Sequence, residues 1–231
     1  METPRIISAV GTSQGQATVL GAGDTRVNLS FPHLLSAASF SCRLGELESE
    51  NEGKQLGAFW DGIFAQSSAV VFAAVAALEA YANELFIDHS EVFPELRDEV
   101  MAKLWELYEQ KPPLEKYEFA LLLKQSAQLD KGSSPYQDVA ALVKLRNALI
   151  HFKPEWFSEQ VEHARLSRIL VHRAMLSPFF PQTEPLFPRG WASHGTAVWA
   201  IKSVVSFILT FEENIRIRPR MEKFKDRFNT L

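Results

Sequence analysis

Cysteine is almost absent from this chain, which contains Cys42 and no other. A single thiol can form neither an intrachain disulfide nor a cysteine-based zinc site. The first residues, Met1 to Arg5, also lack the basic and then apolar pattern of a secretory signal. Both absences favour a reducing compartment, and we expect the protein to be cytoplasmic.

Long uncharged apolar runs are missing as well. The nearest approaches are Ile63 to Leu85, which includes Glu79 and Glu84, and Ala197 to Phe211, which is short and carries Lys202. A membrane-spanning helix needs about 20 nearly uncharged residues. Both stretches are therefore expected to be core helices, with no membrane as a partner.

An excess of positive charge is lacking too, because 24 Lys and Arg residues are set against 28 Asp and Glu residues, a net charge of −4. Phosphate affinity comes mainly from clustered Lys and Arg, so broad, non-specific nucleic-acid binding is disfavoured. Any RNA contact must be local. The hydrophobic fraction of 46% is that of an ordinary folded protein.

The pattern of residues predicts an all-α fold with a small β appendage at the N-terminus. Residues 1–30 alternate β-prone runs with glycines, the last run being Val27 to Leu29, and indicate short strands with tight turns. Residues 31–231 read as a single α-helical domain with a C-terminal helical extension. The expected helices span 32–50, 59–86, 94–110, 113–127, 136–152, 156–174, 196–215 and a short one within 218–228.

The segment from Asp138 to Pro154 carries the most chemical information. At about 100° per residue, its apolar residues Val139, Leu142, Leu145 and Leu149 share one helical face. Asn147 and His151 lie one turn apart on the opposite face, and Arg146 lies at the edge of the apolar one. A guanidinium in that position needs a carboxylate or a phosphate as a partner.

Arg146-Asn147-Ala148-Leu149-Ile150-His151 resembles the Arg-x4–6-His signature of HEPN (higher eukaryotes and prokaryotes nucleotide-binding) domains. The run from Ala77 to Leu85, with Glu79 and Asn83, is similar to an early HEPN helix that bears an acidic residue and an Asn. The resemblance extends from about Phe59 to Ala174 and implies a HEPN-like helical bundle.

The resemblance also implies a metal-independent endoribonuclease, with no cofactor, in which the 2′-hydroxyl of the RNA attacks the adjacent phosphate. His151 has the ordinary pKa range for moving the proton, and the fork of Arg146 suits the developing phosphate charge. Asn147 would orient the His or hold the phosphate, with Glu79 and Asn83 in support. The family association suggests a prokaryotic toxin or defence effector, and allows an antitoxin or regulator protein as partner.

On one ideal helix Arg146 and His151 point about 140° apart, so a single copy presents them poorly to one phosphate. HEPN-like proteins commonly bring two motif helices together, and we therefore expect a homodimer with the 136–152 helices near its two-fold axis. The sequence leaves a second function open, namely a non-catalytic HEPN-like dimeric module that binds RNA, a nucleotide or a partner protein.

Several residues also admit purely structural roles. Glu79 is expected to be buried and paired with Arg146, and His151 could simply favour the C-terminal dipole of its helix. His163 reads as a solvated helix residue. The aromatic loop 176–191 either packs on the core or stacks bases, and the basic C-terminal residues either line an RNA path or form a solvated face. These basic residues are Arg216, Arg218, Arg220, Lys223, Lys225 and Arg227.

Overall fold

The computed structural model describes residues 26–221, 224 and 228, and within this part the regular structure is entirely helical. The α-helices are α1 (Ser30–Glu50), α2 (Phe59–Ile87), α3 (His89–Val92), α4 (Asp98–Tyr108), α5 (Pro113–Leu123), α6 (Ser134–Ile150), α7 (Glu162–Leu170) and α8 (His194–Ile215). Two short helical segments, η1 (Phe157–Glu159) and η2 (Leu186–Gly190), lie in the connections. The all-α expectation is confirmed for the described residues.

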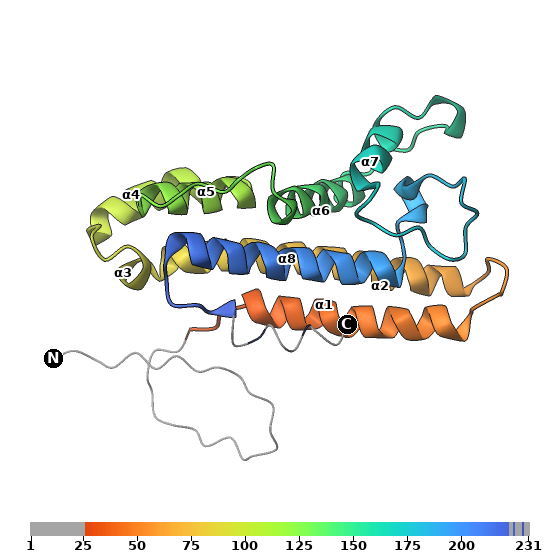
Figure 1. The fold of residues 1–231 in the computed structure, drawn as a ribbon, viewed down its shortest axis with the longest axis horizontal. Coiled ribbons are helices and arrows are strands. Elements are labelled where there is room, and N and C mark those ends of the chain that lie inside the picture. The colour runs from red at the N-terminus through yellow and green to blue at the C-terminus, as the bar shows by residue number, and fades with distance from the viewer. Residues whose placement is uncertain (1–25, 222–223, 225–227, 229–231) are drawn as a thin grey trace, which may run out of the picture.

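Three long helices, α1, α2 and α8, run side by side (Figure 1). Helices α4, α5 and α6 follow one another along the opposite side of α8 from α1, while η1 and α7 stand away from the bundle at one end (Figure 1). Helices α2 and α8 pack against each other and each packs against α1, α5 and α6, so together they form the centre of the arrangement.

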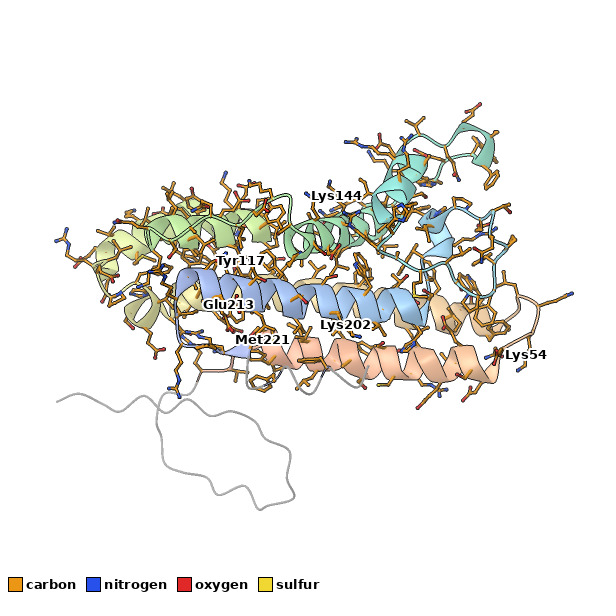
Figure 2. All side chains as sticks on the ribbon, in the orientation of Figure 1. Lys54, Tyr117, Lys144, Lys202, Glu213 and Met221 are labelled. Atoms are coloured by element: carbon orange, nitrogen blue, oxygen red, sulfur yellow. The ribbon has the colours of Figure 1, made fainter. Side chains whose placement is uncertain are left out.

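The apolar runs of the sequence form this centre. Helix α2 buries Val70, Val71, Ala74 and Leu78, and α8 buries a comparable series that ends in Phe207 and Phe211. Both helices are long and apolar enough to cross a membrane by length and composition alone. In the bundle they pack against each other, as expected of core helices. Tyr117 of α5 lies against α8 (Figure 2), with its ring 4.9 Å from that of Phe207.

The aromatic loop between α7 and α8 packs on the first turns of α2. The ring of Phe179 lies 4.9 Å from that of Phe59, and the ring of Phe180 lies 4.9 Å from that of Trp60. Trp191 is fully buried. Of the two roles open for this loop, the structure therefore shows the packing role, because rings engaged in this way do not present a free face for bases.

Three details of the expected secondary structure are wrong. Residues 26–29 form no strand, and helix α1 already begins at Ser30; the other β-prone runs lie outside the described residues. The helix expected over 94–110 begins only at Asp98, after the separate turn of α3. The helix expected over 156–174 is reduced to η1 and α7, for a reason that the contacts of Glu155 supply below.

Candidate functional site

Arg146 of α6 faces Glu79 of α2, with Nη2 3.6 Å from the nearer carboxylate oxygen, Oε2. The expected pair is present, but the expected burial of Glu79 is wrong, since its side chain is 40% exposed against 23% for that of Arg146. The physical reason is that Phe72, Ala76 and Glu79, spaced by four and three residues, form a stripe of α2 that the bundle leaves open.

This stripe and the end of α6 enclose a shallow hollow of about 130 Å³, lined by Phe72, Ala76, Glu79, Arg146 and Ile150. Its walls are apolar, while its charge comes from the Arg146–Glu79 pair. The Nε atom of Arg146 is buried and has no hydrogen-bond partner among the described residues. The guanidinium is therefore held by one long contact, which leaves hydrogen-bonding capacity unused.

Asn147 and His151 are both exposed at the end of α6 and are not among the residues that line the hollow. His151 terminates the helix, and its backbone N–H donates to the carbonyl of Asn147 at 2.9 Å. Within the described part of the chain neither side chain makes a hydrogen bond. One copy thus keeps Arg146 and Glu79 together but leaves His151 facing solvent, as the 140° separation on an ideal helix predicts.

Asn83, which the sequence predicts in a supporting role beside Arg146 and His151, is engaged with another residue. Its side-chain oxygen accepts a hydrogen bond from the ammonium of Lys116 on α5 at 2.7 Å. Lys116 is only 1% exposed, and its ammonium lies over the Trp105 ring, 5.4 Å from the centroid. Burial lowers the pKa of Lys116, an effect that the nearby carboxylates Glu79 and Glu109 oppose.

Sequence reasoning missed Lys116 altogether. A signal was present, because Lys116 precedes Tyr117 and lies one turn before Ala120 on a helix whose other face is apolar. The pattern could suggest a partly buried lysine, but it could not show which residue of α2 would accept a hydrogen bond from it. The result is a polar row across three helices, in which Glu79 is near both Arg146 and Lys116.

At the C-terminal end of α2, carboxylates bind the segments that precede α1 and follow α8. Glu84 accepts the backbone N–H groups of Leu29 and Ser30 at 2.8 and 2.9 Å, and also the Ser30 hydroxyl at 2.6 Å. It thereby satisfies donors that the start of α1 leaves free. Asp88 pairs with Arg26 and, at 2.8 Å, with Arg220.

Glu212 of α8 is the most fully partnered of these acids. It is 3% exposed and accepts the Tyr81 hydroxyl at 2.6 Å and the backbone N–H groups of Arg220 and Met221 at 2.7 and 2.9 Å. Burial and the Glu212 carboxylate raise the pKa of the Tyr81 hydroxyl far above its ordinary value. This group of contacts fixes the chain after α8.

Only part of the basic C-terminal group can be placed. Arg220 is engaged with Asp88, and Arg216 ends α8 in a left-handed conformation with φ of 58°. Lys223, Lys225 and Arg227 lie outside the described residues.

The segment after His151 presents its aromatic residues to solvent. Trp156 is 81% exposed and Phe157 74%, and both belong to the part that stands away from the bundle in Figure 1. Glu155 accepts the backbone N–H groups of residues 161, 162 and 163 at 3.0 to 3.1 Å, and so starts α7 late. That capping explains why no continuous helix covers 156–174.

His163 is buried, contrary to the expectation of a solvated residue. Its Nε2 atom lies 2.9 Å from the carbonyl of Lys153, and its ring lies 5.4 Å from that of Phe152 and 5.0 Å from that of Phe187. The cause is the return of the 152–161 segment over α7, which sequence periodicity cannot foresee. His163 anchors the base of the exposed aromatic segment.

Within the described residues no group of three or more His, Cys, Asp or Glu side chains is placed to hold a metal ion. Comparison of the chain with protein-family models, with curated proteins and with solved structures gave no match. Its function must therefore be argued from the residues of the site itself.

Proposed function

We propose that this protein is a HEPN-like, metal-independent endoribonuclease that works as a homodimer. The observation that carries the proposal is the arrangement at the end of α6, where Arg146 lines an open hollow and Asn147 and His151, within five positions of it, are exposed to solvent. The Arg-x4-His spacing and the acidic partner helix, from which the resemblance was inferred, thus occur on adjoining elements.

The local charge supports contact with RNA. Residues 144–175 contain six Lys and Arg residues and three Glu residues, although the whole chain has a net charge of −4. Two of these cations, Lys144 and Arg146, lie on α6 itself, and Figure 2 shows Lys144 on its outer side. A local cation excess in this segment matches a local phosphate contact.

The chemistry needs a base and an acid. As the 2′-oxygen bonds to phosphorus, its proton must be removed, and the 5′-oxygen that leaves must receive one. A single His151 can carry one of these protons at a time, whereas two copies supply two imidazoles. Arg146 would stabilise the charge on the non-bridging oxygens with its Nη donors, which make no hydrogen bond within the described residues.

The test is to incubate the purified protein with mixed RNA in EDTA and to identify the ends of any fragments. The proposal requires cleavage that EDTA does not inhibit and 2′,3′-cyclic phosphate ends. Hydrolysis that leaves 5′-phosphates, or that stops in EDTA, would overturn it.

One observation favours a non-catalytic HEPN-like module instead. Glu79 already offsets part of the charge of Arg146 across a 3.6 Å gap, which weakens the attraction of the guanidinium for a phosphate. Under this second proposal the dimer binds RNA, a nucleotide or a partner protein without cutting. A protein that binds RNA fragments but leaves all of them intact would support it.

A further inference from the structure

The exposed aromatic segment after α6 offers a feature that RNA cleavage does not use. Trp156, Phe157 and Val161 are 81%, 74% and 68% exposed, on a segment that projects from the bundle. Its base is held firmly, because Glu155 caps α7 and His163 packs between aromatic rings. A rigid, projecting group of large apolar side chains is typical of an interaction surface.

The charges beside these rings argue against an RNA occupant. Residues 155–162 include Glu155, Glu159 and Glu162 and no Lys or Arg. Carboxylates at that density repel phosphates, so base stacking on Trp156 would be opposed by the backbone of the same strand. The expected occupant is a surface that combines an apolar depression with positive charge.

The hollow between α2 and α6 has apolar walls, and α6 adds the exposed cation Lys144 to the Arg146–Glu79 pair that lines it. Its volume of about 130 Å³ is a little below that of a cavity that holds benzene, about 150 Å³, so it has room for the six-membered ring of an indole while the rest of the side chain stays at the rim. Phe72 and Ile150 line it and are themselves 40% and 52% exposed. Arg146 offers a guanidinium for a ring face, Glu79 can accept an indole N–H, and Lys144 is exposed on the same helix.

We propose that Trp156 of one copy inserts into the hollow of a second copy, and the reverse, so that two such contacts form the homodimer. This inference rests on the dimer of the proposed function and specifies how it is held. The exposed Glu159 and Glu162 then lie against the cations of α6, while Glu155 stays engaged with the start of α7. His151 and Trp156 are five positions apart in the chain, a span of at most about 18 Å. The contact therefore brings His151 of one copy toward Arg146 of the other.

Cross-linking between two differently labelled proteins tests the contact directly. Both carry Cys42→Ser; one also carries Ser158→Cys, beside the intact Trp156, and the other Ala76→Cys, in the hollow. When they are mixed, a thiol-specific reagent with a reach of about 10 Å, one helix diameter, should join them. Trp156→Ala in both proteins, which removes both contacts, should abolish the product. A cysteine at Leu107, which is exposed on α4, should give none in place of Ala76→Cys.

The dimer dissociation constant provides the second test, measured by sedimentation. Trp156→Ala should raise it by about 30-fold or more, as loss of a buried tryptophan at an interface commonly does, and Leu107→Ala should leave it unchanged. A dimer indifferent to Trp156→Ala, or a wild-type monomer at 100 µM (about the upper end of the usual range), would overturn the inference. The first result would leave the endoribonuclease proposal standing, since cyclic phosphate ends are assayed separately.

Discussion

Glu79 and Glu84 lie five residues apart on the same helix, yet their surroundings have little in common. Glu84 accepts three hydrogen bonds and ties α1 to α2. Glu79 makes one contact of 3.6 Å with Arg146, beside a hollow, and is 40% exposed. Glu84 is fully hydrogen-bonded, whereas Glu79 and Arg146 keep hydrogen-bonding groups that have no partner within the described residues.

The comparison extends to the residues that surround each of the two carboxylates. Around Glu84, Asp88 and Glu212, every acid engages donors of the chain ends, so these residues serve the fold. Around Arg146 the polar groups are less fully engaged, because its Nε is buried without a hydrogen-bond partner among the described residues and the imidazole of His151 is exposed. Incomplete pairing in a native protein is expected where a ligand or second chain supplies the missing group.

The largest effect is expected from Glu212→Ala. The change leaves the Tyr81 hydroxyl and two backbone N–H groups buried without their acceptor, so the free energy of unfolding should fall by at least about 3 kcal/mol. Its exposed neighbour provides the matched control, because Glu213→Ala should change stability by less than about 0.5 kcal/mol. Urea denaturation measures both, and equal losses would contradict the structural role of Glu212.

Glu84→Ala should have an intermediate effect. It removes the acceptor at the start of α1, and loss of a helix-capping group usually costs about 1 to 2 kcal/mol. Amide hydrogen exchange should then show faster opening in the first turn of α1 than elsewhere. Uniform protection along α1 after the substitution would argue against this capping contact.

Lys116 should make stability depend on pH in the alkaline range. Its folded-state pKa is lowered mainly by burial, so the folded state binds its proton less tightly than the unfolded state does. Its contribution therefore becomes more favourable as pH rises through the folded-state pKa toward the ordinary value of 10.5. Chemical denaturation from pH 7 to 10 should show this gain in the wild type and not in Lys116→Met.

The smallest effect is expected from Glu79→Gln. Because the pair is partly exposed and long, its loss should cost no more than about 1 kcal/mol, well below the loss from Glu84→Ala. Removing Glu79 should at the same time strengthen RNA binding, since Arg146 loses the one counter-ion contact that it makes within the described part of the chain. Fluorescence anisotropy with labelled RNA measures the second effect, and weaker binding would contradict the comparison.

Much of the fold could be predicted from periodicity alone. The runs that form α2, α6 and α8 gave helix ends within two residues of those in the structure, because their apolar patterns are long and end at proline or polar residues. The segment from Trp156 to Val161 could not be predicted as irregular, since its structure depends on Glu155 capping a helix six residues away.

Of the candidate site, the pairing of Arg146 with Glu79 could be predicted from the sequence, but the surroundings of that pair could not. Spacing on one helix places Arg146 and His151 relative to each other, and the Arg146–Glu79 contact followed from charge. The exposure of Glu79 and the bond from Lys116 to Asn83 depend on how α2, α5 and α6 lean together, which one sequence does not reveal.

The most direct test of the account compares RNA cleavage by the wild type and by His151→Ala. Both should fold and dimerise alike, while metal-independent cleavage should fall by about 100-fold or more in the variant, the usual effect of losing a general acid or base. His172→Asn provides a control, because His172 is also exposed and Asn tolerates its positive φ of 68°. Equal cleavage by His151→Ala and the wild type would contradict the catalytic role of His151.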